Sequence, residues 1–173
     1  MTTIAYRAGV LAADTRAYGG DRRPLGQKTK IRALESGELI GCSSPVPGTG
    51  EAVMDWYASG MTPKHRPDVE QNFTFIAVSP DGTARIMVDG FNLTGPIVAE
   101  FFAIGSGEDY AMAAMSMGAD AMKAVEIASL HDIFTAAPFM SLTHKQKKLP
   151  SPDGDKQLDL PLDKGKVVKL KPK

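Results

Sequence analysis

The stretch MTTIAYRAGVLAAD (residues 1–14) decides the fold. Residues 3–7 alternate and are rich in residues that favour β-strands, and Ala8-Gly9 is a turn signal. Residues 10–13 form a short apolar run that ends at Asp14. This pattern predicts a β-hairpin whose first strand begins almost at the start of the chain, directly after Thr2.

The rest of the chain continues with short strands and three helices. Turn formers and charged residues fill 15–27, which we expect to be a loop. The further predicted elements are strands over 30–34 and 38–43, a helix over 50–59, a helical turn over 67–71, strands over 73–77, 84–88 and 96–104, helices over 109–117 and 120–131, and a strand over 139–143. Runs of antiparallel strands with segregated helices are typical of the α+β class.

The body of the chain differs in composition from its C-terminal segment. Residues 1–143 carry 11 Lys and Arg against 16 Asp and Glu, whereas residues 144–173 carry nine Lys against four Asp. The segment 144–173 is rich in Lys, Asp, Pro and Gly. Because it buries too little apolar surface to offset its ordering entropy, we predict one domain over 1–143 and a disordered basic tail over 144–173.

Global features restrict the class of protein. A net charge of +0 gives no bulk field that favours direct binding to nucleic acid or membrane. The single cysteine, Cys42, excludes an internal disulfide and fits a reducing compartment. No apolar run approaches the roughly 18 residues that a membrane span needs, and the N-terminus lacks the pattern of a signal peptide. We therefore expect a cytoplasmic protein.

Thr2 combines the two groups that a nucleophilic hydrolase needs. Removal of Met1 would give Thr2 a free α-amine beside its own hydroxyl, and an α-amine titrates near ~7.7–8.0. The amine can therefore act as the base that a hydroxyl nucleophile requires. A lysine held by a carboxylate would lower the pKa of both groups. Asp14, Lys28 and Lys30 are the candidates on the following strands.

Several segments resemble, in order and spacing, the pattern of proteasome β-subunits and bacterial HslV. They are Met1-Thr-Thr-Ile-Ala-Tyr, Gly9-Val-Leu-Ala-Ala-Asp14-Thr-Arg, Lys28-Thr-Lys30-Ile-Arg, Ala103-Ile-Gly-Ser106-Gly-Glu-Asp-Tyr-Ala and Asp132-Ile-Phe-Thr135. The resemblance covers roughly residues 2–143. It implies the fold of N-terminal-nucleophile (Ntn) hydrolases, a four-layer αββα sandwich with two antiparallel sheets between helix layers.

The resemblance also implies roles for individual residues. Thr2 matches the nucleophile, Asp14 the carboxylate that orients the lysine, and Lys30 the catalytic lysine, with Lys28 as the alternative. Ser106 matches the serine that hydrogen-bonds the terminal amine. Asp132 and Thr135 match the residues that support Thr2 from behind. The implied activity is amide-bond hydrolysis of peptides or proteins, with self-assembly into a homo-oligomer or ring and no metal or organic cofactor. An unfolding ATPase partner is not readable from the sequence.

Three departures from the family pattern concern the site and the fold. The family's Gly-x-x-Gly, whose second glycine donates an N–H to the oxyanion hole, reads Gly41-Cys-Ser-Ser44. Ser44 keeps a backbone N–H, but its Cβ restricts the backbone conformation. Ala136-Ala137 stand where Gly-Gly is usual. The second helix of the family is expected to be truncated here.

Other readings of single residues remain open. Cys42 could be a nucleophile with His65 or His131 as base, although a buried strand thiol is the simpler interpretation. The methionines at 112, 115, 117 and 122 indicate core or subunit packing.

The tail contains a segment that resembles the peptides that dock on the bacterial DNA sliding clamp, Gln157-Leu158-Asp-Leu160-Pro-Leu162. Alternate leucines in such a segment could fill pockets on a partner. A non-catalytic Ntn-fold scaffold tethered by this tail, or an amidase for small molecules, are the alternative functions.

Overall fold

The computed structural model describes residues 2–19 and 23–144. Its strands are β1 (Thr3–Arg7), β2 (Val10–Asp14), β3 (Arg16–Tyr18), β4 (Pro24–Gln27), β5 (Ile31–Ala33), β6 (Leu39–Ser43), β7 (Thr74–Val78), β8 (Ala84–Val88), β9 (Thr94–Ile97), β10 (Phe101–Gly105) and β11 (Phe139–Thr143). The helices are α1 (Thr49–Ala58), α2 (Glu108–Ser116) and α3 (Ala121–Ala128), with a 3₁₀ turn at Pro63–His65. The α+β class predicted from the sequence is confirmed.

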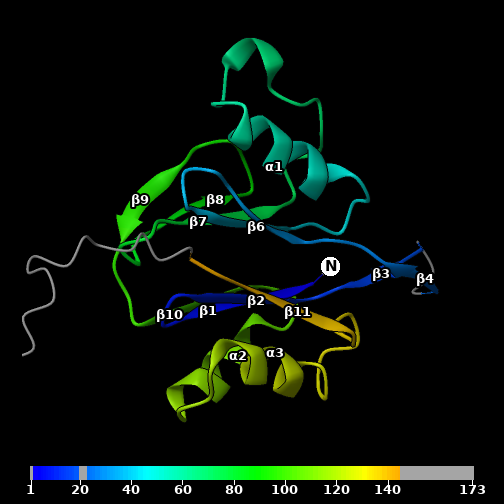
Figure 1. The fold of residues 1–173 in the computed structure, drawn as a ribbon. Helices are drawn as coiled ribbons and strands as arrows, with labels where there is room; N and C mark the ends of the chain where they lie inside the picture. The colour runs from blue at the N-terminus through cyan, green and yellow to red at the C-terminus, as the bar shows by residue number, and fades with distance from the viewer. Residues whose placement is uncertain (1, 20–22, 145–173) are drawn as a thin grey trace, which may run out of the picture.

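Two antiparallel sheets form the body of the molecule. One has four strands in the order β10-β1-β2-β11, and the other has five in the order β5-β6-β7-β8-β9. The predicted N-terminal hairpin is present, and β1 lies between β2 and β10 (Figure 1). Because β1 begins at Thr3 and is paired on both sides, the residue before it is fixed inside the fold.

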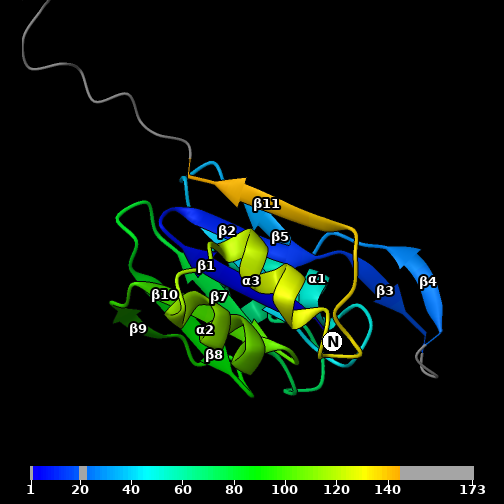
Figure 2. The same ribbon diagram turned by 90° about the horizontal axis from the view of Figure 1, so that it is seen from below.

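Three apolar clusters hold the layers together. The first lies between the two sheets and includes Ile4, Leu11 and Ile76. The second joins α1 to the five-stranded sheet through side chains such as Trp56 and Phe75. The third joins α2 and α3 to the four-stranded sheet and is built mostly from small residues and Met115, which let helix and sheet approach closely. Helices α2 and α3 lie side by side under that sheet (Figure 2).

The segment 15–27 is not the loop that we predicted from the sequence. Strands β3 and β4 within it pair with each other as a separate two-stranded sheet beyond the main body. All four residues of β4 are exposed, and they include Pro24 and Gly26. An exposed strand with turn-forming residues carries no apolar alternation, so its sequence reads as a loop.

Two other predicted elements also differ. The apolar run 96–104 is divided between β9 and β10, which belong to different sheets. A continuous apolar run does not reveal where the chain crosses from one buried layer to another. The predicted helical turn over 67–71 is replaced by the 3₁₀ turn at Pro63–His65, where Pro63 occupies the first helical position. Helix α3 starts as expected, with the Asp120 side chain accepting a bond from the Lys123 N–H, and ends at Ala128 before the predicted limit.

His144 belongs to the folded body and not to the tail in which the sequence placed it. Its N–H donates to the Gly9 carbonyl, and its Nδ1 lies 2.9 Å from the Gly37 carbonyl oxygen. Residues 145–173, including the clamp-like segment 157–162, lie outside the described residues. No helix in the described part of the chain has the length and apolar character needed to cross a bilayer.

Candidate active site

Thr2 is buried at the start of β1, with 2% of its surface exposed. Its carbonyl oxygen accepts bonds from the Ser106 N–H at 2.9 Å and from the Ser106 hydroxyl at 3.3 Å. Gly105, with φ +102°, makes this approach possible, since a Cβ there would clash with the Thr2 carbonyl oxygen. The Gly105-Ser106 pair at the end of β10 therefore holds the backbone of Thr2 in place.

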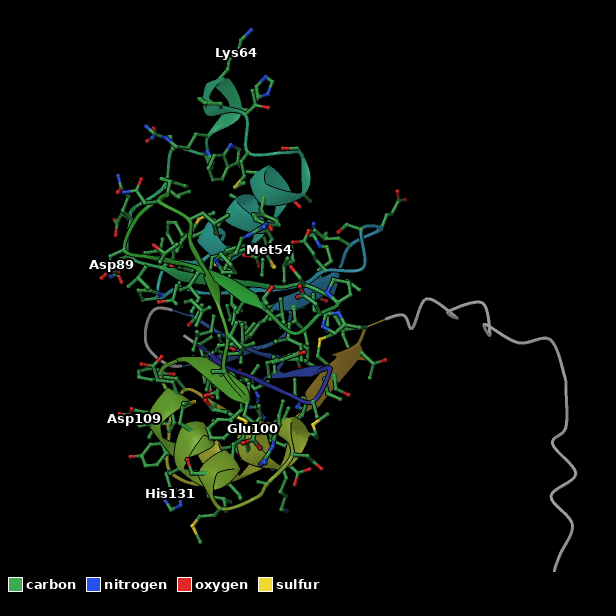
Figure 3. The ribbon with its side chains drawn as sticks, turned by 90° about the vertical axis from the view of Figure 1, so that its left-hand side faces the viewer. Met54, Lys64, Asp89, Glu100, Asp109 and His131 are labelled. Atoms are coloured by element: carbon green, nitrogen blue, oxygen red, sulfur yellow. The ribbon has the colours of Figure 1, made fainter. Side chains whose placement is uncertain are left out.

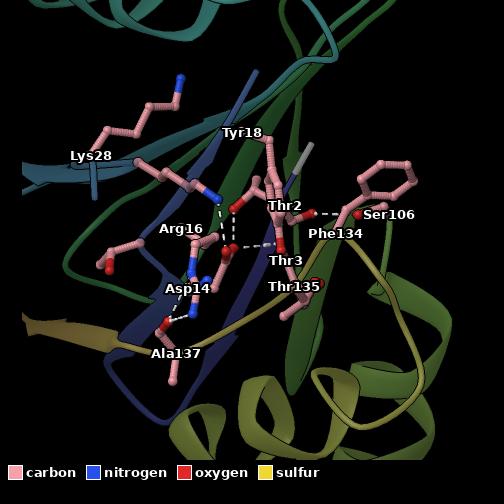
Figure 4. Close-up of polar contacts among 12 residues, drawn as sticks. Thr2, Thr3, Asp14, Arg16, Tyr18, Lys28, Ser106, Phe134, Thr135 and Ala137 are labelled. Atoms are coloured by element: carbon pink, nitrogen blue, oxygen red, sulfur yellow. Dashed lines mark hydrogen bonds and ion pairs between the residues drawn. The ribbon is translucent and has the colours of Figure 1, made fainter. Parts of the chain in front are cut away.

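The Thr2 hydroxyl is joined to a buried ion pair. It donates to Asp14 Oδ1, which also accepts the Thr3 N–H at 3.1 Å (Figure 4). The other carboxylate oxygen, Oδ2, lies 2.8 Å from Lys30 Nζ. Asp14 ends β2 and Lys30 directly precedes β5, so the contact bridges the two main sheets. The structure thus brings together three residues that the sequence singled out.

Lys30 is a buried cation in contact with the Asp14 carboxylate. The side-chain exposure of the lysine is 2% and that of Asp14 is 0%. Burial lowers the pKa of Lys30 below its ordinary value, and the Asp14 charge and hydrogen bond oppose that shift. Lys28 acts in the same direction as burial, because a second positive charge disfavours the protonated form. The site therefore holds a lysine that gives up its proton more readily than one in water.

A second chain of hydrogen bonds supports the start of β1 from the helix layer. Asp132 Oδ2 accepts the hydroxyls of Ser106 and Thr135, each at 2.6 Å. The Thr135 hydroxyl lies 2.5 Å from that of Thr3. These side chains come from the segments that follow β10 and α3, which are adjacent in space although far apart in sequence. Ser106 contacts the carbonyl of Thr2, and its contact with a free terminal amine stays a prediction.

Of the two candidate lysines, Lys30 is the one that contacts Asp14. Lys28 Nζ instead lies 3.0 Å from Glu51 Oε1 in the first turn of α1. The two lysines do not lie on one strand, because residues 28–30 precede β5 and do not form part of it. Without the alternation of a strand, neighbouring side chains need not return to the same side.

Ser44 follows β6 and lines a pocket next to this cluster. Its hydroxyl donates to the Asn72 carbonyl at 3.0 Å and accepts the Val46 N–H at 3.1 Å. Among the described residues, the non-glycine positions with positive φ are Ala8, Met61 and Asp89. Ser44 therefore has a backbone conformation that any L-residue adopts, and its Cβ introduces no left-handed strain.

Cys42 is a buried thiol between the five-stranded sheet and α1. Burial, together with the Glu51 charge, raises its pKa to about 12, so at neutral pH it is not a thiolate. His131 stacks on Tyr110, with ring centroids 5.2 Å apart, and lies with Asp109 on the helix layer far from α1 (Figure 3). His65 lies in the exposed 3₁₀ turn. The interpretation of Cys42 as a structural residue is confirmed by its burial.

Three contributors to the site were missed by sequence reasoning. Thr3 links the start of β1 to Thr135, and the repeated Thr-Thr was its only signal. The Arg16 guanidinium donates twice to the Ala137 carbonyl, at 3.1 and 2.7 Å, and fixes the Ala136-Ala137 segment. Glu51 neutralises Lys28. Within the described ranges, no group of three or more His, Cys, Asp or Glu side chains is placed to hold a metal ion.

Solved structures share this architecture. BPH of Thiobacillus denitrificans in complex with epoxomicin aligns with a TM-score of 0.58 at 15% identity, over 82% of this chain and 96% of that one. A second structure of Thiobacillus denitrificans BPH gives 0.57 at 17%, over 88% and 99%. Eukaryotic HslV from Trypanosoma brucei gives 0.59 at 19%, over 82% and 97%. This chain has the HslV-type fold.

The likeness is one of structure and not of overall sequence. No family model matches the chain, and no curated protein matches it either. At 15–19% identity the likeness establishes only how the strands and helices are arranged. The chemistry of the site depends on the buried Thr2, Asp14 and Lys30 of this chain.

Proposed function

We propose that this protein is a threonine peptidase that hydrolyses amide bonds through an ester on Thr2, after removal of Met1. The observation that carries the proposal is the buried contact of the Thr2 hydroxyl with Asp14, which in turn holds Lys30 at 2.8 Å. A hydroxyl, a carboxylate and a cation joined in this way at the start of a chain match the needs of an activated nucleophile. Within this proposal the fold is the four-layer αββα Ntn sandwich, with residues 2–143 as the hydrolase domain.

The proposed reaction has two steps. The Thr2 hydroxyl attacks the substrate carbonyl, the α-amine of Thr2 accepts the hydroxyl proton, and the oxyanion is stabilised by the Ser44 N–H. The amine then protonates the leaving nitrogen, and an ester forms on Thr2 as the C–N bond breaks. In the second step water attacks the ester with the same amine as base. The acid product leaves and the Thr2 hydroxyl is restored.

Each supporting residue has one task in this proposal. Lys30 provides positive charge that favours the deprotonated hydroxyl. Asp14 holds Lys30 in position. Ser106, Asp132 and Thr135 fix the backbone and the amine of Thr2 from the helix side. No organic cofactor takes part in this scheme.

The decisive measurement is the mass of the purified protein before and after treatment with a threonine-directed epoxyketone. We expect a mass that lacks Met1, and an increase by one inhibitor after treatment that maps to Thr2. A boronate that competes with the label would support the same site. A protein that retains Met1 and takes up no label would contradict the peptidase proposal, since an acylated Thr2 nitrogen cannot act as the base.

Exposed apolar side chains support self-assembly as part of this proposal. Met117, Leu130 and Ile133 on the helix layer are 89%, 77% and 61% exposed. A contact with a second copy of the chain on this layer would remove these apolar side chains from water. A homo-oligomer or ring in the cytoplasm, acting on peptides or proteins, is the assembly that we propose. No contact among the described residues points to an ATPase partner. An amidase for small molecules would use the same chemistry as the proposed peptidase.

The second candidate is a scaffold tethered through its tail to the DNA sliding clamp. The observation that favours it is the stretch Gln157-Leu158-Asp-Leu160-Pro-Leu162, which is similar to the peptides that dock on that clamp. In this candidate Gln157, Leu158, Leu160 and Leu162 bind the clamp.

A pull-down with purified sliding clamp tests the tether. We expect the full chain to retain the clamp and the variants Gln157→Ala and Leu160→Ala to lose it, because each removes a side chain that would fill a pocket on the partner. Equal recovery by all three proteins would end the idea.

A further inference from the structure

A pocket of about 410 Å³ lies beside the Thr2 cluster. Its walls come from the segments that carry the cluster, since Arg16 follows Asp14, Lys28 precedes Lys30 and Phe134 precedes Thr135 by one or two residues. Arg16, Tyr18, Lys28 and Phe134 are seen around Thr2 in Figure 4. Ser44, the oxyanion donor of the proposed function, is a further wall residue. The substrate residue whose carbonyl lies between Thr2 and Ser44 is therefore the one whose side chain reaches this pocket.

Most of the pocket wall is apolar. Its apolar residues are Ala17, Tyr18, Leu25, Pro45, Pro47 and Phe134. Tyr18 and Phe134 meet edge to face, with ring centroids 6.3 Å apart, and form one continuous side. An apolar side chain that displaced water from these surfaces would bind favourably, in proportion to the area that it covers.

The charged part of the wall is an ion pair. Lys28 Nζ lies 3.0 and 3.4 Å from the two carboxylate oxygens of Glu51. Arg16 adds a third charge, but its guanidinium donates two bonds to the Ala137 carbonyl. Lys28 and Glu51 keep 36% and 42% of their side-chain surface exposed, so both remain within reach of a ligand.

The ion pair disfavours a charged ligand side chain of either sign. Attraction of the ligand group to one member of the pair is offset by repulsion from the other. A charged group also loses part of its hydration against the apolar wall, which costs free energy. With Arg16 included, the charged residues of the pocket wall carry a net charge of +1. Binding of a basic side chain is therefore disfavoured more than binding of an acidic one. An amide side chain avoids the conflict, since it can accept from Lys28 and donate to Glu51.

We propose that the Lys28–Glu51 pair determines the specificity of this pocket, which accepts a long uncharged side chain, apolar or amide, from the residue on the acyl side of the scissile bond. The assignment of the acyl side rests on the proposed function. The chemistry of the pocket does not, because it follows from its wall residues alone.

The test is equilibrium binding of N-acetylated tripeptide amides that end in Leu, Gln, Glu or Arg to the full chain carrying Thr2→Ala, which cannot turn them over. We expect the Leu and Gln peptides to bind more tightly than the Glu peptide, and the Arg peptide to bind least. Adding Lys28→Met leaves Glu51 unpaired and should raise affinity for the Arg peptide by roughly two- to fivefold. Adding Glu51→Gln should raise affinity for the Glu peptide by a similar factor.

Lys64→Met is the matched control, because Lys64 is an exposed lysine in the 3₁₀ turn, does not line the pocket and lies at the outer tip of the molecule beyond Met54 (Figure 3). Lys28→Gln provides a second variant should Lys28→Met fail to fold. An unchanged ranking in the Lys28 and Glu51 variants, or no binding of any peptide, would overturn the proposal. Epoxyketone labelling of the same variants with Thr2 intact reports separately on the proposed function, since labelling can fail while the binding ranking shifts as expected.

Discussion

Replacement of Thr2 by alanine is expected to abolish epoxyketone labelling and to lower peptide hydrolysis by about 10⁴-fold or more. The variant keeps a small second residue, so we expect Met1 to be removed as proposed for the wild type, which leaves the terminal amine in place. It lacks the hydroxyl that forms the ester. The neighbouring Thr3 hydroxyl cannot replace it, because Thr3 is fully buried and lies 2.5 Å from the Thr135 hydroxyl.

Thr2→Ser is the matched control for this experiment. Serine restores both the hydroxyl and the amine, so hydrolysis and labelling should return in part. Urea denaturation of both variants separates a loss of chemistry from a loss of fold. Hydrolysis by the alanine variant at the wild-type rate would show that another group attacks the substrate.

Removal of one member of the Asp14–Lys30 pair is expected to destabilise the protein by about 3–5 kcal/mol. Both side chains are buried, and each is the charged partner of the other at 2.8 Å. Asp14→Asn leaves a buried ammonium without its carboxylate, and Lys30→Met leaves a buried carboxylate without its ammonium. Urea denaturation of each variant gives the change in the free energy of unfolding.

The double variant, Asp14→Asn with Lys30→Met, tests whether the loss comes from the unpaired charge. We expect it to be less destabilised than the sum of the single variants, because neither member of this pair is left as an unpaired charge. Additive losses would contradict a direct pair. All three proteins should be inactive in hydrolysis, since both groups serve the Thr2 hydroxyl in the proposed reaction.

The pH dependence of Asp14→Asn follows from the pKa of Lys30. Burial already lowers that pKa below its value in the unfolded chain, and Asp14 opposes the shift. Without Asp14 the folded pKa falls further. A lysine whose pKa is lower in the folded than in the unfolded protein destabilises the fold most at pH values below its folded-state pKa. This loss in the free energy of unfolding shrinks as the pH rises towards the pKa of the lysine in the unfolded chain. The variant should therefore be less destabilised, relative to wild type, at about pH 9 than at about pH 7.

Local patterns predicted much of this fold. The alternation in residues 3–7, the Ala8-Gly9 turn and the apolar run to Asp14 led to the β1–β2 hairpin, which the structure contains. The Asp120 cap marked the start of α3. Elements without such a pattern were missed. Strand β4 is exposed and strand β3 is half-buried, and within the described residues they form a sheet of their own, so no apolar periodicity marks them.

The candidate residues of the site were visible only in part. A threonine in second position, and an Asp and a Lys near strand ends, occur in many chains, and it was their order, similar to that of proteasome β-subunits and HslV, that selected Thr2, Asp14 and Lys30. Glu51 and Arg16 could not be selected. Their partners, Lys28 and the Ala137 carbonyl, are distant in sequence and meet them only through packing.

Neighbouring residues were enough to predict the hairpin, the α+β order of elements and a hydroxyl directly after Met1, because each of these features is local. That Lys30 and not Lys28 reaches Asp14, and that Lys28 meets Glu51 beside the pocket, emerged from the packed structure. These contacts join different sheets and a helix. Their geometry is set by how the layers pack, which the spacing of residues along the chain does not contain.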